Sequence, residues 1–125
     1  MKVTVIDYGL SNLLSVRHAF AHFGAETLLT SDPADVLAAE KLVLPGVGAF
    51  KDGMGGLARL GLIEPIRQKA AAGTPLLGIC LGMQMLFDES EEFGLHKGLG
   101  LIPGRVVKIP DTDMDGHPQK VPHIS

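Results

Sequence analysis

The fold of this chain is decided by the stretch Gly78-Ile79-Cys80-Leu81-Gly82-Met83-Gln84, which carries its only cysteine. The apolar run Leu76–Ile79 precedes the thiol and predicts a buried strand. A helical segment follows from Met83, with an expected end near Glu89. Glycines two residues before and two residues after the cysteine give the spacing of the G-x-S-x-G nucleophile elbow, with sulfur in place of oxygen. The pattern predicts a reactive cysteine on a sharp turn between a strand and a helix.

Each part of this turn has a chemical reason. A nucleophile on such a turn points outward while the backbone beside it packs closely, so glycine at 78 and 82 avoids a clash at Cβ. A thiol at a helix N-terminus lies at the positive end of the helix dipole, which favours thiolate. The amide of Leu81 would point into the site and could hold a developing oxyanion. A lone cysteine is otherwise a small buried apolar residue, but the paired glycines at a strand–helix junction favour catalysis.

Outward from this motif, apolar strands alternate with amphipathic helices. Strands are predicted at 2–6, 25–29, 41–44 and 74–79, and helices at 12–23, 33–39, 51–60 and 62–72. Strands that are apolar almost throughout predict an α/β fold, a doubly wound parallel sheet with helices on both faces. The active site of such a sheet forms at the carboxyl ends of its strands. Glycine-bearing loops near Gly9, Gly46 and Cys80 occupy three of these ends.

The C-terminal part has a different character. Residues 95–104 are glycine-rich and predict a loop, 104–110 predict one more strand, and 111–116 predict a polar turn. The three acids of that turn have a spacing faintly like that of a calcium loop. No acid follows Asp115 to supply the bidentate ligand, so a solvated turn is expected. His18 and His22 have metal-like spacing, but no Cys, Asp or Glu is placed to complete a site, and we expect neither a metal nor a cofactor.

Composition excludes several classes of function. A length of 125 residues fits a single domain. The net charge of −3 and the lack of a basic cluster argue against a nucleic-acid partner. One cysteine permits no internal disulfide, which is consistent with a reducing compartment. The apolar run at the N-terminus is too short for a signal peptide or a membrane span. We therefore expect a cytoplasmic protein that binds neither nucleic acid nor membrane.

Motifs along essentially the whole chain resemble those of class I, or triad-type, glutamine amidotransferases. They are Asp7-Tyr8-Gly9 with Asn12, Leu44-Pro45-Gly46-Val47-Gly48-Ala49-Phe50, the cysteine elbow, Gly98-Leu99-Gly100-Leu101-Ile102-Pro103-Gly104, and Lys120-Val121-Pro122-His123. The elbow alone would indicate only the amidotransferase class. The second and fourth motifs resemble those of the glutaminase subunits of imidazole glycerol phosphate synthase, which serve histidine biosynthesis.

The resemblance implies a glutaminase. Cys80 would attack the side-chain amide of glutamine, form a thioester and release ammonia. The oxyanion would be held by the Leu81 amide and by an amide of the Gly46–Val47 segment. In this family the second donor behaves as a switch, misoriented until a partner subunit activates it. Glycine on both sides of Val47 makes such a peptide rotation sterically easy.

The resemblance also implies residues for binding. Gly48, Gln84 and Glu92 match positions that contact glutamine, and a carboxylate at Glu92 would bind its α-ammonium group. The alternative for Glu92 is a solvated acidic helix end.

A further implied surface faces the partner. Tyr8, Gly9 and Asn12 match the surface turned toward the cyclase subunit, a (β/α)-barrel that makes imidazole glycerol phosphate and AICAR and receives the ammonia through its core. The alternative for Gly9 is an ordinary turn residue.

One part of the family pattern is missing. The catalytic base of the family is a histidine in a His-x-Glu pair, and none of the five histidines here is followed two residues later by Glu or Asp. His117-Pro118-Gln119 comes closest, but a neutral Gln119 cannot stabilise an imidazolium ion. We therefore expect residues 1–125 to be the amino-terminal part of a longer subunit, nearly inactive alone. The expected fold would then expose a sheet edge and an apolar face that favour association.

Two other functions remain open from the sequence. The first is another thiol hydrolase on a related fold, peptidase-like or glyoxalase-like, which would share the elbow but would not need Gln84 or the Pro45–Gly48 loop. The second is a non-catalytic folding or interaction module, which the absent His-x-Glu pair would suit. Glutamine-dependent chemistry at Cys80 separates these from a glutaminase.

Overall fold

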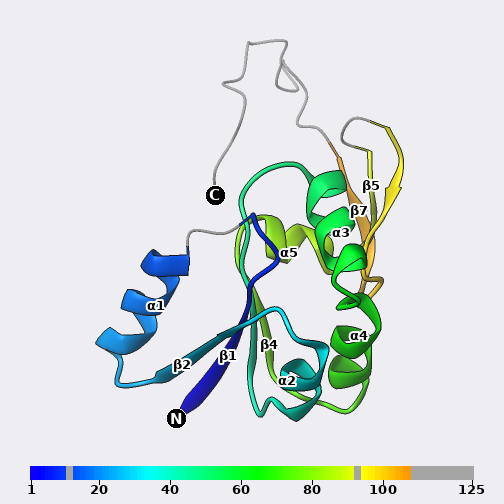
Figure 1. Cartoon of the computed structure of the whole chain (residues 1–125). Coiled ribbons are helices and arrows are strands. Elements are labelled where there is room, and N and C mark those ends of the chain that lie inside the picture. The colour runs from blue at the N-terminus through cyan, green and yellow to red at the C-terminus, as the bar shows by residue number, and fades with distance from the viewer. Residues whose placement is uncertain (11–12, 92–93, 108–125) are drawn as a thin grey trace.

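The computed structural model describes residues 1–10, 13–91 and 94–107. Its centre is a parallel sheet with the strand order β2-β1-β3-β4 (Figure 1). The strands are β1 (Lys2–Ile6), β2 (Glu26–Thr30), β3 (Leu42–Leu44) and β4 (Leu76–Gly78). All four run in the same direction, with Val3 opposite Thr27 and Val43 opposite Leu77. Their carboxyl ends therefore meet at one edge, as the apolar strands predict.

Helices cover both faces of this sheet. One face carries α1 (Leu13–His22), and the other carries α2 (Pro33–Ala38), α3 (Phe50–Arg59), α4 (Ile63–Ala71) and α5 (Leu81–Met85) (Figure 1). The prediction of a doubly wound sheet is confirmed. None of the helices in the described part of the chain has the length and apolar character that crossing a bilayer requires.

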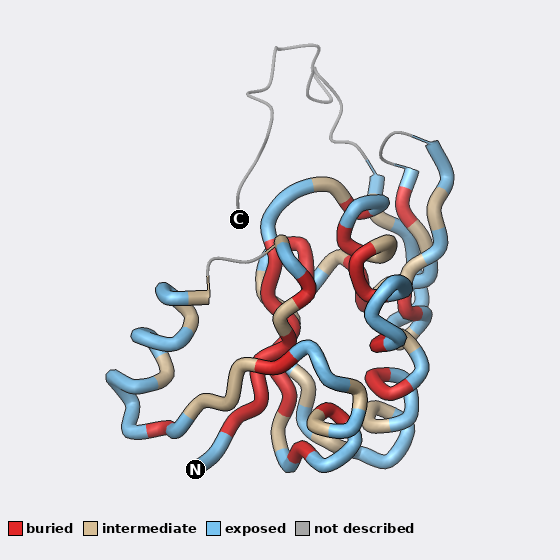
Figure 2. Tube along the Cα trace, in the orientation of Figure 1, coloured by how far each residue is buried: buried red, intermediate tan, exposed pale blue. Residues whose placement is uncertain are grey.

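Alternation along the strands divides the core into two parts. On the α1 face, Val3, Val5 and Val43 pack against partly buried side chains of α1. Ile6 and Leu44 face the other side, where the larger cluster with α2 to α5 lies. The chain is buried along the inner strands and the inward surfaces of α3 and α5, whereas α1 has no buried residue (Figure 2). The larger part of the core therefore lies on the face covered by α2 to α5.

The start of α2 follows from its sequence. Asp32 is the N-cap with extended backbone, and its Oδ1 accepts a hydrogen bond from the Ala34 amide at 2.9 Å. Pro33 occupies the first helical turn, where its missing N–H costs nothing. The helix predicted at 33–39 is confirmed, and it ends one residue earlier, at Ala38.

A second, smaller sheet corrects the prediction for the region after the elbow. It has the order β6-β5-β7, with β5 (Phe87–Ser90), β6 (His96–Lys97) and β7 (Ile102–Val106). The expected helix to Glu89 is wrong, because α5 ends at Met85 and the chain continues as a strand.

Backbone pairing over long range explains this difference. The amides of Gly98, Leu99 and Leu101 donate to the carbonyls of Asp88, Met85 and Leu86, at 2.7 to 2.8 Å. These contacts take the carbonyls that a longer helix would have used. The expected loop over 95–104 contains β6 and the start of β7, so the strand expected at 104–110 begins earlier, at Ile102. Residues 108–116, with the expected polar turn, lie outside the described residues.

Arg105 joins two strands of this small sheet at its surface. Its guanidinium donates to Glu89 Oε1 on β5, with Nε at 2.7 Å, and to Glu91 Oε1, with Nη1 at 2.6 Å. Hydrogen bonding to Glu89, and then to Glu91, raises the pKa of Arg105 above its ordinary value. Arg105 therefore faces both carboxylates as a charged guanidinium near neutral pH.

Candidate active site

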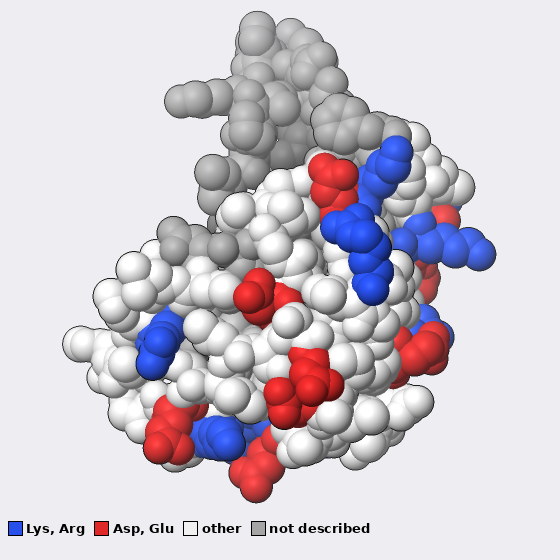
Figure 3. Space-filling view, in the orientation of Figure 1, with Lys and Arg blue, Asp and Glu red and all other residues white. Residues whose placement is uncertain are grey.

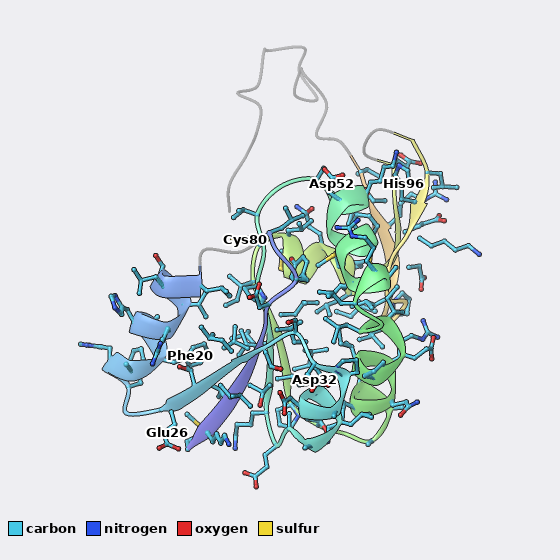
Figure 4. All side chains as sticks on the ribbon, viewed as in Figure 1. Phe20, Glu26, Asp32, Asp52, Cys80 and His96 are labelled. Carbon is cyan, nitrogen blue, oxygen red and sulfur yellow. The ribbon has the colours of Figure 1, made fainter. Side chains whose placement is uncertain are left out.

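Cys80 lies on a strained turn at the carboxyl end of β4 and directly before α5 (Figure 4). Its backbone angles are φ 52° and ψ −118°, and it is the single non-glycine residue with positive φ in the described part of the chain. Such angles cost an L-residue roughly 1–3 kcal/mol and concentrate at functional sites. Cys80 is a free cysteine and is exposed. The geometry is that of a nucleophile elbow.

The flanking glycines are required by close packing. A Cβ on Gly78 would lie 2.7 Å from Met83 Cα and 2.9 Å from Met83 N. A Cβ on Gly82 would overlap the Leu44 carbonyl, with Leu44 C at 2.6 Å. Both obstacles are backbone atoms, which have little freedom to move. The steric reason inferred from the sequence therefore holds at both positions.

The amides of Leu81 and Val47 were expected to form the oxyanion hole, but both are hydrogen-bonded to backbone carbonyls. The Gly46 carbonyl accepts a hydrogen bond from the Leu81 amide at 3.0 Å. The Val47 N–H donates to the Leu10 carbonyl at 2.7 Å. In this arrangement neither amide is available to stabilise a developing negative charge. Val47 is 58% exposed, so the two hydrogen bonds, more than packing of its side chain, set the orientation of the Gly46–Val47 peptide.

Tyr8 supports this loop from within the core. It is 4% exposed, and its hydroxyl donates to the Pro45 carbonyl at 2.5 Å. A Cβ on Gly46 would overlap the Tyr8 hydroxyl and lie 3.0 Å from its Cζ, so glycine is needed there. Tyr8 was expected at a partner surface, but its side chain is buried because the hydroxyl binds the loop from below.

Gly48, Gln84 and Gly9, which were also predicted for the site, lie around the same edge of the sheet. Gly48 is exposed with φ 116°. Gln84 lies half-buried on α5, and its backbone N–H donates to the Cys80 carbonyl at 3.2 Å. Gly9 is exposed with φ 97°, and its amide donates to Asp7 Oδ1 at 3.2 Å. Asn12 and Glu92 lie outside the described residues.

Leu10 is a site residue that the sequence did not indicate. Its carbonyl holds the Val47 amide and so fixes the orientation of the Gly46–Val47 peptide. A backbone carbonyl is present at every residue, so no side-chain pattern marks it. Only the fold brings this carbonyl to Val47, across 37 positions of the chain.

Comparison with known proteins agrees with this geometry. The family model described as glutamine amidotransferase class-I matches residues 4–124, and the chain belongs to that family. A solved structure titled crystal structure of glutamine amidotransferase shares the fold, with a TM-score of 0.72 and 19% identity, over 85% of this chain and 56% of that one. A putative peptidase E from Listeria monocytogenes EGD-e shares it with a TM-score of 0.64 and 16% identity, over 81% and 62%.

Individual relatives are much closer in sequence. Subunit HisH 1 of imidazole glycerol phosphate synthase from Legionella pneumophila (strain Lens) is 57% identical over 122 residues, which are 98% of this chain and 57% of the relative. Subunit HisH from Syntrophotalea carbinolica is 54% identical over 123 residues, or 98% and 60%. The chain thus spans a little more than half the length of these relatives.

Proposed function

We propose that this chain belongs to a glutaminase subunit of imidazole glycerol phosphate synthase, acting in histidine biosynthesis. The observation that carries the proposal is the strained elbow at Cys80, in a chain 57% identical to subunit HisH 1 of Legionella pneumophila. The Pro45–Gly48 loop lies against that elbow, which suits acyl transfer with a backbone oxyanion hole.

The proposed chemistry proceeds through Cys80. Its Sγ attacks the side-chain carbonyl carbon of glutamine and forms a C–S bond. The C–N bond then breaks, the leaving nitrogen takes the proton that the thiol has given up, and ammonia departs from the thioester. Water hydrolyses the thioester to glutamate and restores the thiol. Gly48, Gln84 and Glu92 are proposed to bind the glutamine.

The proposed control of this reaction is rotation of the Gly46–Val47 peptide. Half a turn would remove the Gly46 carbonyl from the Leu81 amide and release Val47 N–H from Leu10. Both donors would then be free to face the oxyanion. The glycines at 46 and 48 support this, because residues without a Cβ allow the backbone on both sides of Val47 to rotate with little steric cost.

The proposed partner is the cyclase subunit, a (β/α)-barrel that uses the ammonia. Gly9 and Asn12 would contact it, with Tyr8 acting from below through Pro45. Because a thiol nucleophile must stay reduced, we place the protein in the cytoplasm.

An electrophilic glutamine analogue, with a diazoketone in place of the side-chain amide, tests the proposal on this chain. We expect one covalent adduct on Cys80 by mass spectrometry, slowed by added glutamine but not by asparagine. Cys80→Ala should remove the adduct, and Gln84→Ala should weaken the protection by glutamine.

The outcome against the proposal is labelling at the rate of a simple alkylator, without protection by glutamine. That result would favour another thiol hydrolase, for which the peptidase E likeness supplies the fold but no substrate. An absent adduct, with Cys80 inert to simple alkylators as well, would favour a non-catalytic module.

A further inference from the structure

A hollow of about 380 Å³ lies between the segment after β1 and the outer surface of α3. It is lined by Tyr8, Gly9, Leu10, Lys51, Asp52, Gly55 and Arg59. Asp52 lies at the end of α3 that faces the same edge of the sheet as Cys80 (Figure 4). The hollow is therefore on the active-site side of the molecule.

Two consecutive glycines on α3 create the space. A Cβ on Gly56 would lie 2.9 Å from the Tyr8 carbonyl oxygen, so α3 packs closely against the segment after β1. Gly55 leaves its outward surface bare, and Arg59 Nη1 lies 3.5 Å from where a Gly55 Cβ would be. The Arg59 side chain therefore runs back along the helix over Gly55 and Gly56 and lines the hollow, while the residue stays exposed to solvent.

The hollow has an excess of positive charge. Lys51 and Arg59 line it against the single carboxylate of Asp52. Ion pairs within 1–10, 13–91 and 94–107 involve Arg67 and Arg105, and neither cation of the hollow has one. Figure 3 shows basic side chains gathered over α3 beside an acidic one. A guanidinium that lines a hollow and makes no ion pair with the carboxylate beside it is suited to bind an incoming carboxylate in two-pronged geometry.

The floor of the hollow is connected to the active-site loop. Tyr8 donates to the Pro45 carbonyl, and Leu10 accepts from the Val47 amide. Gly9 between them is exposed and belongs to the surface proposed above for the partner. A group bound in the hollow would therefore touch the segment that holds the Gly46–Val47 peptide.

We propose that this hollow is a docking site for a carboxylate side chain of the cyclase subunit, bound by Arg59 and Lys51. The inference rests on the proposed function for the identity of the partner. A competing role for Arg59 is structural, because a cation in the last turn of α3 is attracted to the negative end of the helix dipole and stabilises the helix. The two roles differ in what substitution changes: affinity for the partner in one case, stability of the free chain in the other.

The test is titration calorimetry of the chain with purified cyclase subunit. Arg59→Met and Lys51→Met keep the aliphatic stems and remove the charges. We expect each to weaken binding roughly tenfold, as the loss of one hydrogen bond to a charged group implies. Added salt should weaken binding of the unmodified chain more than that of the double variant. Lys69→Met, on α4, is the matched control and should bind unchanged.

Three results would overturn the docking site. They are equal affinity of the variants and the unmodified chain, equal weakening by Lys69→Met, and no binding of the unmodified chain at all. Urea unfolding of each free variant distinguishes the structural role of Arg59 from docking. If the role is structural, Arg59→Met lowers the unfolding midpoint but leaves the affinity of the folded molecules for the cyclase unchanged. Labelling of Cys80 by the glutamine analogue is measured without the cyclase, so failure of the docking site and failure of the glutaminase proposal are told apart.

Discussion

At the scale of single residues, Cys80 combines exposure with an unfavourable backbone conformation. Its φ of 52° and ψ of −118° suit glycine and strain every residue with a Cβ. The strain is maintained because both neighbours of the turn are packed, with Leu81 buried and the Ile79 amide bonded to the Leu44 carbonyl. The thiol is therefore held at this position at a cost in stability.

Replacing Cys80 should reveal that cost. Cys80→Gly removes the strain, whereas Cys80→Ala keeps it and deletes only the sulfur. Strain relief of roughly 1–3 kcal/mol exceeds the extra backbone entropy of glycine, about 0.5–1 kcal/mol. We expect Cys80→Gly to be as stable as Cys80→Ala or up to about 2 kcal/mol more stable in urea unfolding. The control is Ala70→Gly in α4, which should lose about 1 kcal/mol. A Cys80→Gly variant that loses as much as the control would contradict the strained turn.

Gly82 should tolerate no side chain. Alanine there would place its Cβ against the Leu44 carbonyl, on a buried inner strand. We expect Gly82→Ala to lower the free energy of unfolding by at least about 2 kcal/mol. Gly55→Ala is the matched control, since the only neighbour within 4 Å among the described residues is the flexible end of Arg59. We expect Gly55→Ala to raise the free energy of unfolding by up to about 1 kcal/mol, because alanine has the higher helix propensity. Equal unfolding midpoints for Gly82→Ala and Gly55→Ala would refute the steric account.

The sequence predicts some of these residues and not others. Gly78 and Gly82 could be recognised because the turn requires glycine at fixed positions, two residues before and two residues after the nucleophile. The orientation of the Gly46–Val47 peptide could not, because it depends on the Leu10 carbonyl and the Leu81 amide, which are backbone groups of distant segments. The buried position of Tyr8 was missed for a similar reason: its hydroxyl is satisfied by Pro45, far away in sequence.

At the scale of elements, local signals predict the first half of the fold well. The α2 helix has an N-cap at Asp32 and a proline in its first turn, so its start is encoded within three residues. The end of α5 is not encoded locally. Residues 83–89 favour a helix by pattern, but the backbone of 98–102 pairs with the carbonyls after Met85 and turns Phe87–Ser90 into a strand. Tertiary hydrogen bonding overrides a weak propensity there.

The cap of α2 can be tested on its own. Asp32→Ala removes the acceptor for the Ala34 amide and should cost about 1 kcal/mol of unfolding free energy. Asp32→Asn keeps an acceptor and should lose much less. A circular dichroism signal followed through urea unfolding measures both variants. Equal losses would mean that the charge at the helix N-terminus matters more than the hydrogen bond.

At the scale of the whole molecule, the two faces of the sheet are unequally covered. Among the described residues, the face under α2 to α5 holds the larger buried cluster, whereas the cluster on the α1 face has Val3, Val5 and Val43 as its buried members. Phe23 is 81% exposed, and Leu77 on the edge strand β4 is 52% exposed. Beside them, an apolar hollow of about 360 Å³ is lined by Val16, Phe20, Phe23 and Ile79, among others. Among the described strands β4 lies at the edge of the sheet, and a strand edge next to such a surface favours association.

We therefore expect the isolated chain to associate through the β4 edge and the α1 face. Sedimentation velocity should give an average mass that rises above 13.2 kDa as concentration increases. Leu77→Lys places a charge on the edge strand and should shift the distribution toward monomer without lowering the unfolding midpoint, because edge charges block strand pairing. Leu37→Lys is the control, since Leu37 is similarly exposed, at 45%, but lies on α2 across the sheet. A concentration-independent monomer would contradict the expected association, and an equal effect of both lysines would mean that general solubility, not the β4 edge, controls it.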